Sequence, residues 1–185
     1  MAEAFSNSLK RAVGIVSTSS SGSIGVYANH ISGISTTNVS VGDLVDNAHY
    51  IAGTKVTGYG ATAGTVTVDQ HSTNSASATS QSITFLGVTT AYTSTAKSIL
   101  IGGTFANNTG NSVNLTVEVY DNSSAGTAHS TAQLACKIPV PTGSSFVISD
   151  AGKTVLEASD SVRVYCDTAN ALDVNLSIIG KCTTN

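Results

Sequence analysis

In Val113-Asn-Leu115-Thr-Val117-Glu-Val119, apolar and polar residues alternate without a break. A period of two is that of a β-strand, whose successive side chains point to opposite faces of a sheet. The same alternation runs through residues 162–166 and 172–178. Each of these strands is therefore expected to turn one apolar face to a core and one polar face to water, as is typical of antiparallel sheets.

Residues that favour turns separate these strands, at 107–110, 121–126, 142–143, 151–152 and 167–170. The spacing of about ten residues per strand is typical of a β-sandwich or a partly closed barrel. Further strands are expected at 99–105, 134–140, 146–149 and 154–156. The sequence thus predicts an all-β protein in which residues 89–185 form a C-terminal antiparallel β-sandwich.

Four residues are predicted to shape turns or edges of this sandwich. Pro139 and Pro141 flank Val140 and have no amide hydrogen to donate, so they indicate a strand end or an edge strand. Gly143 can adopt the positive φ that closes a turn after Pro141. Asp160 can cap a tight turn between two strands by bonding the nearby backbone.

Residues 14–88 are predicted to form a small β module, because their strand candidates are short and separated by glycines. Two tracts rich in serine, threonine, alanine and asparagine, at 17–23 and 71–82, are expected to be flexible loops. Residues 58–64 carry three glycines and are expected to be a hairpin turn rather than a dinucleotide-binding loop.

Residues 1–13 are predicted to be a separate N-terminal arm. Phe5, Leu9 and Val13 recur at i, i+4 and i+8, a spacing that can line one side of a short helix. A helix shorter than about 12–15 residues is marginal in isolation. We therefore expect these three side chains to dock the arm on a partner surface, with the sandwich folding without it.

The composition excludes several classes of function. Only 10% of the 185 residues are charged and the net charge is −3, so the chain has no field that attracts nucleic acid or an anionic membrane. Serine and threonine, 27 and 25 residues, replace the missing charges at the surface. No apolar run reaches the roughly 20 residues that span a bilayer, and no secretory signal is apparent. Cys136, Cys166 and Cys182 have neither zinc-site spacing nor the pattern of a disulfide framework.

No set of residues indicates catalysis, a cofactor or a metal. His30, His49, His71 and His129 lie in polar segments without a G-x-S-x-G motif nearby, so no nucleophile triad is predicted. The spacing of Asp43, Asp46 and His49 would suit a metal on a helix, but β-branched residues and Gly42 favour a strand and turn there.

Carboxylates and aromatic side chains were the other possible sources of a sugar site. Glu118 and Glu157 are expected to be solvated rather than paired for glycoside hydrolysis. The chain has no tryptophan, so a sugar-stacking platform would need a tyrosine. The candidates for that weak glycan contact are Tyr27, Tyr50, Tyr59 and Tyr92.

Two longer stretches carry motifs of a known kind. The first contains Ile34-Ser-Thr-Thr-Asn-Val-Ser-Val-Gly-Asp-Leu-Val45, Ile51-Ala-Gly-Thr-Lys-Val-Thr57, Val66-Thr-Val-Asp69 and Ser82-Ile-Thr-Phe85. The second contains residues 98–110 and 113–119, Ile138-Pro-Val-Pro-Thr-Gly-Ser144 and Val155-Leu-Glu-Ala-Ser-Asp-Ser-Val-Arg-Val164. They resemble, respectively, a small β module of phage fibre and tail-associated proteins and a β-sandwich of phage structural proteins, especially those of cyanophages. In this pattern Ser159 stands where glycine is more usual.

The resemblance implies a non-enzymatic structural component of a tailed-phage virion, such as a neck, tail or fibre-associated protein. Such a protein would assemble in the host cytoplasm, contact other virion proteins and form homo-oligomers on a symmetric particle, without binding nucleic acid or membrane. Two alternatives stay open, a capsid decoration protein and a glycan-binding adhesin or fibre module. No catalytic, cofactor or metal residue is expected in any of them.

Overall fold

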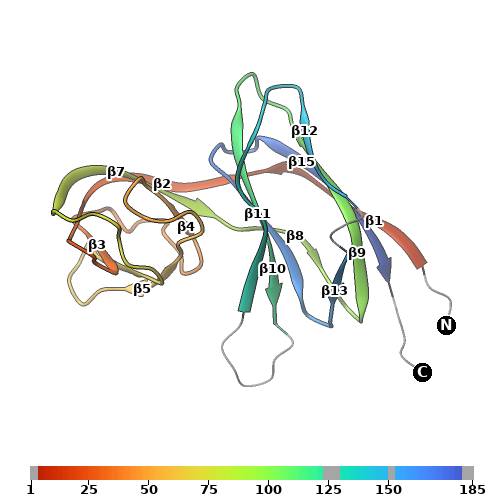
Figure 1. Ribbon diagram of the computed structural model, residues 1–185, viewed down its shortest axis with the longest axis horizontal. Coiled ribbons are helices and arrows are strands. Elements are labelled where there is room, and N and C mark those ends of the chain that lie inside the picture. The colour runs from red at the N-terminus through yellow and green to blue at the C-terminus, as the bar shows by residue number, and fades with distance from the viewer. Residues whose placement is uncertain (1–3, 123–129, 150–152, 181–185) are drawn as a thin grey trace. The chain divides into compact units, whose positions relative to one another are not determined.

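The computed structural model describes residues 4–122, 130–149 and 153–180 (Figure 1). Its regular elements are strands, arranged in three antiparallel sheets, and the predicted all-β class is confirmed. The predicted turns at 121–126 and 151–152 lie partly or wholly outside the described residues, as do His129 and Cys182. The chain divides into two compact units, residues 15–88 and the remainder.

The larger unit is a sandwich of two sheets. The first sheet has the order β1-β15-β9-β12, with β13 also paired to β9, and consists of β1 (Ala4–Val13), β15 (Leu172–Gly180), β9 (Ser98–Asn107), β12 (Ser145–Ile148) and β13 (Thr154–Leu156). The second has the order β11-β10-β14-β8 and consists of β11 (Ser130–Val140), β10 (Val113–Asp121), β14 (Ser161–Cys166) and β8 (Thr89–Thr93).

The core lies between these two sheets and follows the alternation read from the sequence. Leu115 and Val117 of β10 are fully buried, as are Phe105 of β9 and Leu176 of β15. Full burial of one such side chain contributes about 1.5–3 kcal/mol to the free energy of unfolding. Inward-facing apolar residues of β9, β10 and β15 therefore account for much of how the sandwich holds together.

The N-terminal segment differs from its prediction. Residues 4–13 form strand β1, which pairs antiparallel with β15, so the predicted helix is wrong and the segment is not separate from the sandwich. Residues four apart share a face in a strand as well as in a helix, which is why Phe5 and Leu9 misled the prediction. Val13 is 1% exposed and belongs to the core, which also rules it out as a docking residue.

The turn after β11 carries the chain from the second sheet to the first. Pro139 lies in β11, an edge strand, as its missing amide hydrogen predicted. Gly143 has φ 65°, and the Ser144 amide donates to the Pro141 carbonyl at 3.2 Å. The glycine therefore provides the left-handed conformation that the sequence predicted for this turn.

Asp160 fixes the turn between β13 and β14. Its carboxylate accepts hydrogen bonds from the backbone amides of Asn122, at 2.9 Å, and Glu157, at 2.8 Å. Ser159 beside it has φ 78°, a left-handed conformation that glycine adopts more easily. The carboxylate thus stabilises a turn whose serine is conformationally unfavourable.

The smaller unit contains a six-stranded sheet with the order β4-β7-β2-β3-β6-β5. Its strands are β4 (Leu44–Asp46), β7 (Ala78–Gly87), β2 (Ile15–Ile24), β3 (His30–Ser32), β6 (Val66–Val68) and β5 (Val56–Tyr59). Ile31, Val66, Ile83 and Phe85 are fully buried in a core of its own. Residues 60–65 connect β5 to β6, which pair antiparallel, so the predicted hairpin is confirmed.

The first predicted loop is wrong, and the second is wrong for residues 78–82 but lies outside any strand at 71–77. Residues 17–23 lie inside β2, and the second tract ends inside β7, its neighbour in the sheet. Hydroxyl side chains pair across the two strands, Ser19 with Thr84 at 3.0 Å. Before β7, buried Ser72 accepts from the Ala28 amide and donates to the Gly25 carbonyl. The Ser- and Thr-rich composition predicted loops because such residues are usually solvated. Here several of their hydroxyls instead form hydrogen bonds to other segments of the chain.

Candidate functional site

The outer face of the first sheet of the sandwich carries a row of apolar side chains. Strand pairing places Phe5 opposite Ile179, Ile179 opposite Ile99, and Ile99 opposite Val155. The row therefore crosses β1, β15, β9 and β13. Phe5 is 77% exposed and Val155 is 52% exposed, while the two isoleucines between them are half-buried. Cross-strand neighbours this close form one continuous apolar strip.

A second row crosses the same face with apolar ends and a polar middle. Leu9 lies opposite Asn175, Asn175 opposite Thr104, and Thr104 opposite Val147. Leu9 is 70% exposed and Val147 is 55% exposed. We call the residues of these two rows, together with Ile101 and Ser177 between them, the outer apolar face.

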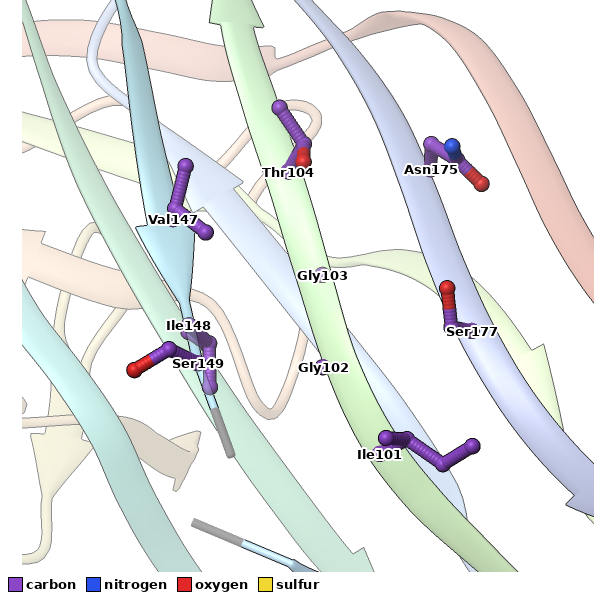
Figure 2. Close-up of a pocket in the computed structure, with 9 residues that line it drawn as sticks. All are labelled: Ile101, Gly102, Gly103, Thr104, Val147, Ile148, Ser149, Asn175 and Ser177. Carbon is purple, nitrogen blue, oxygen red and sulfur yellow. The ribbon is translucent and has the colours of Figure 1, made fainter. Parts of the chain in front are cut away.

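Two shallow hollows adjoin on this face and share Ile101 and Ser177. The one between β12, β9 and β15 has a volume of ≈ 330 Å³, and the one beside β1 has ≈ 420 Å³. Figure 2 shows the first, with Val147 on one side, Asn175 and Ser177 on the other, and the bare backbone of Gly102 and Gly103 between them. Their open form suits a protein surface better than an enclosed small molecule.

Glycine is required at the floor of this hollow by close approach. A Cβ atom on Gly102 would lie 2.7 Å from the Ile148 carbonyl oxygen, and one on Gly103 would lie 2.6 Å from the Leu176 side chain. Both distances are shorter than van der Waals contact. The two glycines thus let β12 and the core approach β9, and they leave the middle of the face without side chains.

Charge flanks the outer apolar face at both ends, with the Arg11–Asp173 pair at one end and the Lys97–Glu157 pair, at 2.9 Å, beside Ile99 and Val155 at the other. Arg11 forms an ion pair with Asp173, with 3.5 Å between Nε and Oδ2. The Ala12 amide, which donates to Asp173 Oδ1 at 3.1 Å, lowers the pKa of that carboxyl, and Arg11 adds to the effect. The remainder of the face offers alkyl groups, the Phe5 ring, hydroxyls and the amides of Asn7 and Asn175, groups that suit contact with another surface.

Of the three predicted docking residues, the structure brings Phe5 and Leu9 to this face and places Val13 in the core. The other apolar residues of this face were not predicted from the sequence. One signal for them exists in Ile99-Leu100-Ile101, three consecutive apolar residues that break the alternation. Only Leu100 of the three is buried in the core. An apolar run of this kind indicates a strand with two apolar faces.

The outer face of the second sheet is built differently. Glu118, predicted to be solvated, is fully buried and accepts a hydrogen bond from the Tyr165 hydroxyl at 3.1 Å. Arg163 lies opposite Glu118 in the strand pairing and stacks its guanidinium 3.4 Å from the centroid of the Tyr120 ring. These four side chains pack on one another, and we call them the polar cluster. Periodicity gave Glu118 its face correctly but could not show that its neighbours bury it.

The other candidates from the sequence do not form a site. Asp43 accepts from the Ser40 amide within its own turn, and the described residues contain no group of three metal-ligating side chains. Tyr50 is buried and its hydroxyl donates to the Ala28 and His30 carbonyls; burial raises the pKa of Tyr50 to about 12. Burial also raises the pKa of the Cys166 thiol to about 11, so at neutral pH it is not a reactive thiolate.

Tyr27 and Tyr59 are the exposed members of the tyrosine set, and Tyr92 is half-buried. The Tyr59 hydroxyl donates to the Val39 carbonyl, which holds its ring in place at the surface. In the part of the chain that the structure describes, there is no helix long and apolar enough to cross a membrane.

Comparison with known proteins identifies no relative. No family model matches the chain, no curated protein is detectably similar to it, and no solved structure shares a detectable likeness.

Proposed function

We propose that this protein is a non-enzymatic structural component of a tailed-phage virion, a neck, tail or fibre-associated protein that docks on a symmetric particle. The outer apolar face is the docking surface, and the partner is an apolar patch on another virion protein. The phage setting is supported by the sequence motifs of residues 34–180. The docking role is supported above all by the apolar row from Phe5 to Val155.

Exposed apolar side chains in contiguous rows are typical of protein-binding surfaces. The face also has the composition of an interface, with no charge at its centre and ion pairs at its rim, Arg11–Asp173 at one end and Lys97–Glu157 at the other. On a particle with many equivalent sites, a modest contact per copy is sufficient, because linked copies raise the effective concentration. Incorporation would occur in the host cytoplasm, where virions assemble.

The test is incorporation of the full chain into particles during infection. We expect the Val147→Ser/Val155→Ser variant to be lost from purified particles, because it removes the exposed valines at which the two rows of the outer apolar face end. The matched control is Val26→Ser/Val41→Ser, two exposed valines of the smaller unit. Circular dichroism of both purified variants verifies folding. Equal incorporation of the two folded variants, or absence of the wild-type chain from particles, would contradict the proposal.

A second candidate is the glycan-binding fibre module, and the exposed, hydrogen-bonded Tyr59 favours it. A tyrosine ring held at the surface can stack on the apolar side of a sugar. Binding of the full chain on a glycan array, abolished by Tyr59→Ala and retained by Tyr50→Phe, would support this function in place of the first. A capsid decoration protein differs from the leading proposal only in the particle surface that it covers.

A further inference from the structure

Strand β1 has an unprotected edge. It lies at the end of its sheet and pairs with β15 on one side, and no strand among the described residues pairs with it on the other (Figure 1). The Ser8 hydroxyl donates to the Ala91 carbonyl of β8, in the second sheet, at 2.9 Å. Of its ten residues, Val13 is buried and Ser8 is half-buried, and the others are exposed. An exposed edge of this length presents a row of backbone donors and acceptors that can pair with another strand.

The sequence of β1 around Asn7, Phe5-Ser-Asn7-Ser-Leu9, has residues of like kind at equal distances on either side of Asn7. Pairing with β15 is continuous from Ala4 to Lys10, and a β-bulge at Ala12, with φ 55°, ends it. An antiparallel partner with the same sequence, centred on Asn7, would pair over the whole of residues 4–10.

We propose that β1 pairs antiparallel with β1 of a second copy of this chain, about a twofold axis at Asn7. In that register Phe5 of one copy lies opposite Leu9 of the other, on the outer apolar face. Ser6 lies opposite Ser8 on the inner side. From Phe5 to Leu9, each side chain therefore faces one of its own kind, and Ala4 faces Lys10 at the ends.

The charges of β1 favour this partner and this direction. Lys10 and Arg11 are its cationic residues in the described part of the strand, and Arg11 is paired with Asp173. In the antiparallel register the two Lys10 side chains are six residues apart, about 20 Å at the rise of a strand. This exceeds the screening length of about 8 Å at physiological salt, so their repulsion is small. A parallel pairing would instead place like charges side by side.

Pairing would join the two first sheets into one and make the outer apolar faces of both copies continuous across β1. This inference goes beyond the proposed function and does not depend on the identity of the docking partner. A seven-residue strand pair is smaller than the interfaces of roughly 1,200–2,000 Å² that hold stable complexes. The dimer is therefore weak and depends on protein concentration.

The first experiment tests the register by cross-linking the full chain. Asn7→Cys places two thiols opposite each other on the axis, at a Cβ separation of about 4.5–5.5 Å that a disulfide can bridge. We expect a covalent dimer under mild oxidation that the wild-type protein, with its native cysteines, does not form. The control Asn175→Cys, exposed on the neighbouring strand β15, should stay monomeric. Equal cross-linking of the two variants, or none by Asn7→Cys, would overturn the proposal.

The second experiment tests the pairing without cysteines, by sedimentation equilibrium over a concentration series. Asn7→Lys puts like charges opposite each other and should weaken dimerisation roughly fivefold, as should Asn7→Glu. An equimolar mixture of the two variants should associate at least as tightly as the wild type. A wild-type chain that stays monomeric throughout, or a mixture no tighter than either variant alone, would refute the pairing.

Discussion

The outer faces of the two sheets of the sandwich differ in how far their side chains are exposed to solvent. On the second sheet, the polar cluster buries Glu118 and Tyr165 by packing long polar side chains on one another. On the first sheet, apolar side chains such as Phe5 and Val155 stay exposed in a row. The polar cluster on the second sheet is thus covered by its own side chains, whereas the outer apolar face on the first sheet stays exposed to a partner. Solvent exposure follows from what neighbouring side chains can cover, not from the polarity of each residue.

The largest expected loss of stability comes from disrupting the polar cluster. Glu118→Ala removes the acceptor of the Tyr165 hydroxyl and the charge opposite Arg163, which leaves buried polar groups uncompensated. We expect the free energy of unfolding to fall by about 3–5 kcal/mol, measured by urea denaturation. Tyr165→Phe should cost about 1.5 kcal/mol, as the loss of one hydrogen bond to a charged group.

The matched control is Asn175→Ala on the outer apolar face, because Asn175 is also an outward polar side chain in a central strand. It should lower the free energy of unfolding by no more than about 0.5 kcal/mol. If Glu118→Ala were as mild as Asn175→Ala, the two faces would not differ as described. The second sheet would then differ from the first only in the residue types on its outer face, not in how those residues are buried.

An intermediate effect is expected from filling the floor of the hollow. Gly102→Ala forces a methyl group toward the Ile148 carbonyl, and the resulting displacement of β12 should lower the free energy of unfolding by about 2 kcal/mol, as overpacking does. Gly110→Ala, where the added carbon meets nothing within 4 Å, should have little effect. Thermal denaturation of both variants checks this. Equal midpoints for the two would show that β12 is free to move away from β9.

The smallest of these losses of stability is expected from replacing the exposed valines of the outer apolar face. Because Val147 and Val155 are already half-exposed, their joint replacement by serine should change the free energy of unfolding by less than about 1 kcal/mol. The same variant is expected to abolish docking. A large loss of stability in urea denaturation would instead indicate that these valines stabilise the fold. The outer apolar face would then resemble the polar cluster in its contribution to stability.

How far the sequence predicts this molecule depends on what periodicity can and cannot encode. The alternation in 113–119 gave β10 and its core residues, because a strand with one buried face imposes that pattern. The same alternation misjudged Glu118, since a period assigns a residue to a face but does not show what covers that face. Phe5 and Leu9 were ambiguous for a related reason, because a spacing of four fits both a helix and a strand.

The candidate site was harder to predict than the fold. Its apolar row joins Phe5, Ile179, Ile99 and Val155, which come from four strands far apart in sequence and meet through register alone. Register depends on turns and bulges, such as the bulge between Ser177 and Ile178. Only the unbroken apolar run at Ile99-Leu100-Ile101 announced a second apolar face locally.

The pairing of β2 with β7 has a consequence for the conditions that this protein tolerates. Ser19 faces Thr84 and Ser21 faces Ser82, so neutral hydroxyls hydrate and link strands where other proteins use lysine and glutamate. Interactions between neutral groups are not screened by dissolved ions and do not titrate between mildly acidic and mildly basic pH. We therefore expect the bond between Ser19 and Thr84 to be insensitive to salt concentration.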